Sequence, residues 1–185
     1  MEQPDPRVLR KAQRGDAQAF TTLVRQYESR LFNFILRSVQ ERTLAEDLMQ
    51  DVLLRVHESL PRFRGGSFTT WLFEIAKNRV IDEHRSGRDR LRSTVPLELV
   101  ATVGVETKIG VEEQLDAIWG VIAGLAWDIR VPLLLREIAG LSYTEIAETL
   151  GLPISTVRWR IFVARQELVQ GLHDLEHPVA IDAMS

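Results

Sequence analysis

The side chains that enzymes use for acid–base or metal chemistry are present, but their spacing argues against a catalytic site. Neighbouring carboxylates such as Glu46 and Asp47 follow one another along a predicted helix, so they point in different directions and cannot converge on one atom. His173 and His177 have a spacing that can hold a metal, but a frayed polar tail is the commoner arrangement near a chain end. The sequence contains no cysteine and no glycine-rich phosphate loop or nucleophile motif. We therefore expect no catalytic residues, no metal site and no cofactor.

Contact with nucleic acid is the chemistry that residues 141–168 indicate. Ser142 and Glu145 have the spacing of a capping box, and Gly151 stands where a short helix must end. Ser155 can then cap a second helix, whose expected buried positions are Val157, Ile161, Ala164 and Leu168. Two short helices joined by a tight turn describe a helix-turn-helix. The alternative is any helical hairpin with a solvated basic face. However, Ala147, Gly151 and Val157 stand at the positions where the DNA-binding motif has a small residue, a glycine and a valine, and this favours DNA binding.

Basic side chains accompany both segments that could touch nucleic acid. The second helix of the motif carries Arg158, Arg160 and Arg165, which could reach phosphates or a guanine edge from the major groove. Residues 62–85 surround a glycine-rich turn with basic and aromatic side chains, a mixture that suits single strands because rings stack on unpaired bases. Taken alone this second signal is weak, since aromatic residues three apart on a helix, here Phe68 and Trp71, are more often core.

The elements that position these residues are predicted to be helical, so we expect an all-α protein. An apolar stripe over residues 20–35 predicts one long helix with Asp16 as its N-cap. Thr43 and Glu46 have capping-box spacing and begin a second helix, which ends at the next proline. Ser67 can cap a third helix behind the glycine-rich turn.

These helices divide into two predicted domains. The first three predict a domain over residues 7–86. Residues 87–110 lose the helical stripe and gain glycine, proline and β-branched residues, which predicts a linker. The alternative there is an edge strand without an evident partner, built from Val95, Val100, Val103 and Val105. Helical patterning returns over residues 111–175, where a further helix is expected to begin at Pro132 and end at Gly140.

Composition sets the broad class of protein. The 185 residues include 23 Lys and Arg against 26 Asp and Glu, for a formal charge of −3, and 45% hydrophobic content excludes a disordered polar chain. Residues 55–92 carry +4 and residues 93–118 carry −4, which supports nucleic-acid contact only weakly. The longest uncharged apolar run, Ile118–Trp127, is well short of the roughly 20 residues that span a bilayer, and the first residues lack the apolar core of a secretory signal. We expect a cytoplasmic protein.

Three segments resemble, in the same order and spacing, those of a bacterial RNA polymerase sigma factor of the extracytoplasmic-function (ECF) group: residues 45–56, 63–85 and 140–168. The resemblance implies a compact helical domain 2 and a domain 4 with the helix-turn-helix, joined by a flexible linker. It implies that the protein binds core RNA polymerase at the clamp of the largest subunit, directs initiation at particular promoters and contributes no chemistry. Its other implied partners are promoter DNA and an anti-sigma factor, and no membrane insertion is implied.

The same resemblance assigns roles to individual residues. Core-polymerase contacts are implied for Asp47, Gln50, Asp51, Leu54 and Arg55. Opening DNA and capturing the non-template bases of the minus-ten element are implied for Arg62, Phe63, Arg64, Ser67, Phe68, Lys77, Asn78 and Arg79. Trp71 matches this part too, but among these residues it is the strongest candidate for the core. Reading of the minus-thirty-five element is implied for Ser155, Thr156, Arg158, Trp159, Arg160 and Arg165.

Two positions depart from the family pattern. Trp159 stands between two arginines where a small polar residue is usual, and Val163 occupies a commonly basic position. Helical stepping places Trp159, Phe162 and Val163 opposite the buried face. We hypothesise that an anti-sigma factor or the protein's own first domain covers Trp159 and Phe162; the alternative is that these two complete the core of the second domain. A helix-turn-helix regulator with a ligand-sensing first domain is the alternative function, and binding to core polymerase separates the two.

Overall fold

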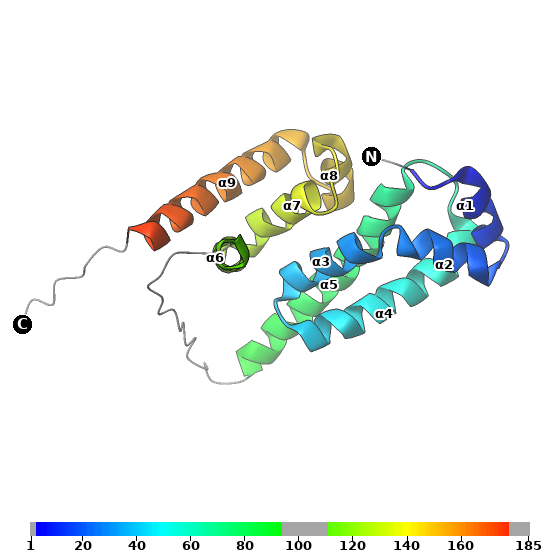
Figure 1. Ribbon diagram of the computed structural model, residues 1–185, viewed down its shortest axis with the longest axis horizontal. Helices are drawn as coiled ribbons and strands as arrows, with labels where there is room; N and C mark the ends of the chain where they lie inside the picture. Colours follow the sequence, from blue (N-terminus) through cyan, green and yellow to red (C-terminus); the bar gives the residue numbers. More distant parts are fainter. Residues whose placement is uncertain (1–2, 94–110, 178–185) are drawn as a thin grey trace, which may run out of the picture.

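The structure, a computed structural model, describes residues 3–93 and 111–177, and within these ranges the chain forms helices and no strand (Figure 1). The helices are α1 (Pro6–Gln13), α2 (Ala17–Arg25), α3 (Glu28–Val39), α4 (Arg42–Ser59), the 3-10 turn η1 (Leu60–Arg62), α5 (Phe68–Ser93), α6 (Val111–Gly124), α7 (Trp127–Glu137), α8 (Tyr143–Leu150) and α9 (Ile154–Glu176). The predicted all-α class is confirmed. No helix in the described ranges is long and apolar enough to cross a membrane.

Helices α3, α4 and α5 pack side by side and form the core of the first helical group, with α1 and α2 at one end (Figure 1). Their inward faces supply a set of almost fully buried apolar side chains: Leu31, Phe34, Ile35, Leu48, Val52, Val56, Leu72, Phe73 and Ala76. Burial of this set removes a large apolar area from water and fixes the three helices against one another. The outer faces of α4 and α5 therefore carry most of the polar residues for which the sequence predicted contacts with polymerase or DNA.

The predicted helix starts in this group are partly wrong. Asp16 does cap α2, accepting a hydrogen bond of 2.9 Å from the amide of Ala19. However, the expected single helix over residues 20–35 is two helices, with the break at Tyr27. The sequence pattern does not reveal this break, because buried apolar residues recur at helical spacing on both sides of it. The N-cap of α4 is Glu41 and not Thr43: its carboxylate accepts from the amides of Thr43 and Leu44.

The second helical group is built around α7, which is buried on nearly all sides from Ile129 to Leu135. It begins at Trp127, so Pro132 lies inside the helix and not at its first position, contrary to prediction. The start is set by Ala126, whose extended backbone leaves its carbonyl to accept from the amides of residues 129 and 130. The helix ends at Glu137, before the expected Gly140, which adopts a left-handed φ of 71° in the following turn.

The helix-turn-helix is confirmed in α8 and α9. Both hydrogen bonds of the Ser142–Glu145 capping box form, and Gly151 ends α8 with a left-handed φ of 63°. Three of the four expected inward residues of α9 are buried and Leu168 is half-buried. Ser155 is not the N-cap, because α9 already starts at Ile154 behind Pro153, whose fixed φ of −58° leads into the helix without a side-chain cap.

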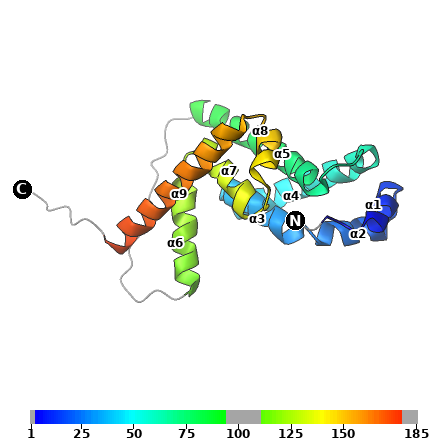
Figure 2. The same ribbon diagram turned by 90° about the horizontal axis from the view of Figure 1, so that it is seen from above.

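The two helical groups are in contact. The first turns of α5 lie beside α8, and α3 lies against α6 and α7 (Figure 2). Helix α5 continues through Gly87 to Ser93, so the first part of the predicted linker is helical. The remainder, which includes the four valines of the alternative edge strand, falls outside the described residues.

Candidate polymerase and nucleic-acid interfaces

The outer face of α4 presents a short polar stripe around one exposed leucine. Asp47, Gln50 and Arg55 are exposed, and 62% of Leu54 is accessible to solvent. Asp51 is half-buried, because Arg79 of α5 donates to its carboxylate over 2.9 Å. A single exposed leucine is common on protein surfaces and does not by itself mark an interface. The five residues assigned to polymerase binding thus share one face, with Asp51 fixed by its ion pair.

The loop between η1 and α5 exposes two arginines on a constrained backbone. Gly65 and Gly66 both have a left-handed φ, of 105° and 88°, which favours glycine over any other residue. Gln13 of α1 donates to the carbonyl of Phe63 over 2.9 Å and so ties the loop to the helical body. Arg62 and Arg64 remain exposed on either side of Phe63. The constrained backbone therefore fixes where the solvent-exposed side chains of Arg62 and Arg64 leave the loop.

The start of α5 is held by two caps, only one of which the sequence predicted. Ser67 Oγ accepts from the amide of Thr70 over 3.2 Å, as expected of an N-cap. Gln3, far away in the sequence, accepts from the amide of Phe68 over 2.9 Å and donates to Ser67 Oγ over 3.1 Å. No local pattern could have identified Gln3, because the contact joins residues 65 positions apart.

An aromatic cluster forms where the loop meets α5. The ring of Phe63 lies 5.1 Å from Trp71 and 5.8 Å from Phe68 between centroids, and Phe68 also packs on Tyr27. Only 2% of Phe68 is exposed, whereas Phe63 and Trp71 are half-buried. The expectation that Trp71 is the main core residue of this segment is therefore wrong: Phe68 fills that place, and Trp71 keeps an accessible edge.

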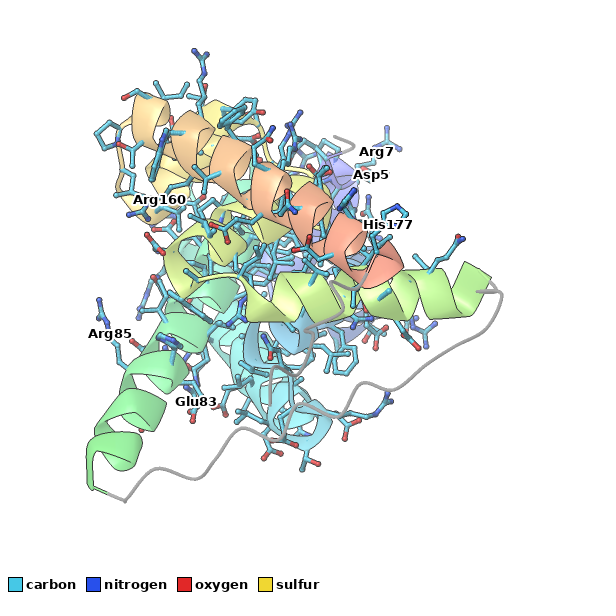
Figure 3. All side chains as sticks on the ribbon, turned by 90° about the vertical axis from the view of Figure 1, so that its left-hand side faces the viewer. Asp5, Arg7, Glu83, Arg85, Arg160 and His177 are labelled. Atoms are coloured by element: carbon cyan, nitrogen blue, oxygen red, sulfur yellow. The ribbon has the colours of Figure 1, made fainter. Side chains whose placement is uncertain are left out.

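The basic residues farther along α5 differ in accessibility. Asn78 is exposed, but Lys77 is 91% buried, and burial lowers the pKa of its ammonium against the opposing charges of Glu74 and Asp82. Arg79 is occupied by Asp51 and by Glu83, whose carboxylate lies 3.5 Å away. Figure 3 shows Glu83 and Arg85 farther along the same helix, with Arg85 projecting away from it. Of the three predicted contacts here, only Asn78 is freely presented to solvent.

The basic residues of α9 lie in different electrostatic surroundings. Arg165 donates to Glu137 over 2.7 Å, a hydrogen bond that raises the pKa of its guanidinium, and Arg160 lies 3.7 Å from Asp128 at the start of α7 (Figure 3). Arg158 is exposed, 6.0 Å from the ring centroid of Tyr143. Ser155 is exposed and Thr156 half-buried in the first turn. The N-terminal turns of α9 therefore present hydroxyl groups and one exposed cation.

Two large aromatic residues lie uncovered on α9. Trp159 and Phe162 are each 60% exposed, so they complete no core and the first helical group does not cover them. Two of the three explanations offered for these residues are therefore excluded in this structure: completion of the second domain's core and cover by the first domain. Val163, expected beside them on the outer face, is instead half-buried against the core. The pair forms an exposed apolar patch on the helix that carries the predicted DNA contacts.

The segment predicted to contact the minus-ten element and the helix-turn-helix, which are separate in sequence, are in contact in the structure. The hydroxyl of Thr70 on α5 donates to Glu145 on α8 over 2.7 Å. Burial raises the pKa of Glu145, but hydrogen bonds from Ser142, Thr70 and Ser67 outweigh it, so the pKa lies below its ordinary value of 4.5. The sequence identified Glu145 only as a capping residue. Its second partner depends on tertiary structure.

The histidines near the end of α9 do not form a recognisable metal centre. The rings of His173 and His177 lie 4.8 Å apart between centroids, but no group of three or more possible metal ligands occurs in the described part of the chain. A lone exposed pair supplies only two ligands of the four that a structural zinc site needs.

Comparison with known proteins identifies relatives across both helical groups. The family model of Sigma-70 region 2 matches residues 23–90, and that of Sigma-70, region 4 matches residues 115–168. The chain is 32% identical to the RNA polymerase sigma-H factor of Pseudomonas aeruginosa, over 94% of this chain and 96% of that protein. It is 31% identical to the ECF RNA polymerase sigma-E factor of Escherichia coli K12, over 89% and 92%.

Two solved structures resemble the fold. CnrH, in complex with the cytosolic domain of CnrY, matches with a TM-score of 0.67 and 25% identity, over 90% of this chain and 95% of that chain. The sigma factor RpoE of Bartonella quintana, in complex with the anti-sigma factor NepR, matches with a TM-score of 0.71 and 24% identity, over 85% and 98%. The second likeness supports the fold alone.

Proposed function

Because the chain belongs to the ECF group of bacterial RNA polymerase sigma factors, we propose that its two helical groups divide the work of promoter recognition between them. The protein binds core RNA polymerase and directs promoter-specific transcription initiation. The observation that carries this function is the match of both sigma-70 regions, in order, to the two groups. A regulator with a ligand-sensing first domain is disfavoured, because the first group matches sigma-70 region 2.

The outer face of α4 is the proposed docking surface for the clamp of the largest polymerase subunit. Exposed Leu54 would enter an apolar depression of the partner, with Asp47, Gln50 and Arg55 at the rim. Asp51 would contribute through the geometry that Arg79 imposes on it. This assigns Arg79 a positioning role in place of a direct contact with DNA.

The loop and first turns of α5 are the proposed minus-ten surface. Arg62 and Arg64 would track the DNA backbone, and the accessible edges of Phe63 and Trp71 would stack on unpaired bases. Ser67 and Asn78 would supply polar contacts. Phe68 and Lys77 are buried, so we propose that they support this surface from below.

The first turns of α9 are the proposed minus-thirty-five reader. Ser155, Thr156, Arg158 and Trp159 would face the major groove, and Asp128 and Glu137 would hold Arg160 and Arg165 in defined rotamers. For the domain bounds, we propose that the first domain extends from α1 to the end of α5, beyond the predicted residue 86, and that the second begins with α6; the helix bounds support this division.

An anti-sigma factor is the proposed inhibitor. The proposal is supported by the uncovered pair Trp159 and Phe162, and by the similar CnrH, whose structure is of a complex with the cytosolic domain of CnrY. A change of Trp159→Ser tests this: the protein stays folded, binds the inhibitor more weakly and transcribes more in its presence. Unchanged inhibitor affinity would exclude Trp159 from that interface. We propose further that the protein has no catalytic activity of its own and acts in the cytoplasm, with the polymerase that makes the bonds.

The direct test is reconstitution. Purified protein, mixed with core polymerase, should co-purify with it and support run-off transcription from a cognate promoter that core alone does not transcribe. Leu54→Asp should abolish co-purification while the circular dichroism spectrum stays unchanged, because Leu54 is exposed. A protein that binds the promoter but never core polymerase would refute the sigma-factor function.

A further inference from the structure

The N-terminal segment takes part in the proposed minus-ten surface although it lies outside the family match. The model of Sigma-70 region 2 begins at residue 23, so α1 and most of α2 precede it. Nevertheless, α1 packs against η1, and the N-terminal end of the described chain lies beside the start of α5 (Figure 1). The loop that carries Arg62 and Arg64 runs between these two places. The N-terminal segment therefore contacts the loop near both of its ends.

Gln13 holds the end of the loop that follows η1. Its Nε2 group donates to the carbonyl of Phe63 over 2.9 Å and, more weakly, to that of Leu60 over 3.4 Å. The last carbonyls of a helical turn need a donor from elsewhere, because they have no intrahelical partner. Gln13 is half-buried, so water competes less for these bonds than at an open surface. The carboxamide thus fixes the direction in which the chain leaves η1.

Gln3 holds the opposite end, where the loop enters α5. Its carboxamide oxygen accepts from the amide of Phe68 over 2.9 Å, and its Nε2 group donates to Ser67 Oγ over 3.1 Å. The same Ser67 oxygen accepts from the amide of Thr70 over 3.2 Å. Gln3 and Ser67 together therefore satisfy two amides of the first turn, which have no partner within the helix. The next residue along the chain, Pro4, is buried and anchors the segment beside α5.

The middle of the loop is intrinsically free to move. A Cβ built on Gly65 or Gly66 would meet no neighbour within 4 Å in the described part of the chain, so side-chain packing does not constrain either glycine. Glycine also loses more conformational entropy on ordering than any other residue. A loop that becomes ordered only on binding DNA spends binding energy on that ordering, whereas a loop held beforehand does not. Holding both ends should therefore increase the affinity for a DNA strand.

We propose that Gln3 and Gln13 are positioning residues for minus-ten recognition: their carboxamides hold residues 62–67 in the strand-binding form before DNA arrives. We call this pair the loop brace. The inference rests on the proposed function, since it assumes that this loop and the first turns of α5 read the minus-ten element. Neither glutamine has to touch DNA. Both precede the matched region, so a protein can share the region 2 pattern and lack the brace.

The first experiment removes the hydrogen bonds of the brace and keeps the length of its side chains. Gln3→Met and Gln13→Met, singly and together, are assembled with core polymerase. The probe is a single-stranded oligonucleotide with the non-template minus-ten segment of the promoter used in the reconstitution, and fluorescence anisotropy gives its dissociation constant. Each single change should raise that constant about three- to tenfold, the range expected for lost hydrogen bonds of this kind, and the double change should raise it further. Gln18→Met, at an exposed position of α2, should leave it unchanged.

A role in folding alone would give a different result. It would lower the fraction of holoenzyme able to bind the oligonucleotide and leave the dissociation constant unchanged. Gln3 is exposed, so Gln3→Met should also keep the melting temperature and the core affinity of the parent. A raised dissociation constant with an unchanged active fraction supports positioning, whereas a parent-like dissociation constant in the double variant overturns it. Should the double variant fail to fold, Gln3→Met alone decides in the same way.

Restoring a donor at position 13 tests the chemistry of the brace. Gln13→Lys places an ammonium group, which donates, within reach of the same carbonyls, and it should recover the affinity of the parent for the oligonucleotide. Gln13→Glu replaces the donor with an acceptor and should bind at least as weakly as Gln13→Met. Both changes alter the charge, so Gln18→Lys and Gln18→Glu are measured beside them at the same salt concentration. Equal affinities of Gln13→Lys and Gln13→Glu, once the effects of these controls are subtracted, would overturn the role of Gln13.

Failure of the proposed function has its own signature. If the parent holoenzyme neither binds the oligonucleotide nor transcribes, the sigma-factor assignment is at fault and the brace is refuted with it. If the parent transcribes and binds the oligonucleotide, and the double variant binds it equally tightly with a full active fraction, the sigma-factor function stands and only the brace is refuted.

Discussion

Arg158 and Arg165 lie on one face of α9 but should respond differently to mutation. Arg158 is exposed, so Arg158→Ala should leave the melting temperature unchanged and reduce promoter binding by the holoenzyme by about 1–3 kcal/mol if it reads a base. Arg165→Ala also breaks the bond to Glu137, but an exposed pair contributes only about 0–1 kcal/mol to folding. Thermal unfolding and footprinting on a promoter measure the two effects.

Glu137→Gln is the matched control for Arg165. It weakens the same ion pair without removing the arginine, so any loss that it shares with Arg165→Ala belongs to positioning. Should Arg158→Ala lower the melting temperature strongly, with transcription in proportion to the folded fraction, its role would be structural.

Glu145 should make the stability of the protein depend on acidity. Its pKa in the folded protein lies below the ordinary value of 4.5, since its hydrogen bonds outweigh burial. A lowered carboxyl pKa means that its stabilisation is fully present above the ordinary value and is lost as the pH falls through the folded value. Urea unfolding at neutral pH and at successively lower pH should show a smaller loss in Glu145→Gln than in the parent.

The other carboxyl groups near α8, including Glu148 and Glu74, which line the same pocket, are present in both proteins and so do not affect that comparison. An identical pH dependence in the two proteins would mean that Glu145 contributes no net stabilisation as a carboxylate.

At the scale of helices, α6 and α9 approach so closely that a side chain at position 171 would clash with Val121. A Cβ built on Gly171 would lie 2.6 Å from Cγ1 of Val121. Gly171→Ala should therefore destabilise the second domain by about 1–3 kcal/mol through overpacking, although alanine is the better helix former. Adding Val121→Ala should rescue it, so that the double variant is more stable than Val121→Ala alone by up to about 1 kcal/mol. Denaturant titration of the parent, the two single variants and the double variant gives the coupling free energy between the two positions. If the changes in unfolding free energy were additive, the two helices would be able to move apart without cost.

The elements that the sequence predicted best are those whose signals are local. The Ser142–Glu145 box, Gly151 and the spacing of Val157, Ile161 and Ala164 depend on residues within a few turns, and they identified the helix-turn-helix correctly. The start of α7 was missed because burial of residues on both sides of Pro132 outweighs the preference of proline for a first turn. Local spacing predicts an element well only where tertiary packing does not override it.

The proposed site shows the same division. Amphipathic stepping predicted that Trp159 and Phe162 face away from the core of domain 4, and they do. Three contacts join residues 28 or more positions apart, so no sequence pattern reveals them: the hydroxyl of Thr70 with Glu145, the amide of Phe68 with Gln3, and Arg79 with Asp51. Sequence therefore separates surface from core on one helix, but it cannot say which surfaces of different helices cover one another.

At the scale of the whole molecule, the distribution of charge does not favour strong binding of the free protein to DNA. The chain is net acidic at −3, two of the three arginines of α9 face carboxylates, and Glu145 and Glu148 line a pocket beside the proposed minus-ten surface. Strong non-specific binding requires many phosphate contacts at once, each releasing counterions. The free protein offers few such contacts on one face.

We therefore expect the isolated chain to bind duplex promoter DNA weakly, with a dissociation constant above about 1 µM at physiological salt and no preference for the promoter over random sequence. The holoenzyme should bind the same promoter far more tightly, because we expect core polymerase to place the two helical groups at the spacing of the two elements and to add phosphate contacts of its own. Fluorescence anisotropy on matched promoter and scrambled duplexes, with and without core, measures both affinities across a salt series. Glu148→Gln removes a carboxylate from the pocket that Arg62 and Arg64 also line. It should strengthen binding by the free chain only slightly, since the two helical groups are in contact and cannot reach two separated promoter elements at once. Tight, promoter-specific binding by the isolated chain would contradict this account, because it would require the two readers to be apart and their arginines available before polymerase arrives.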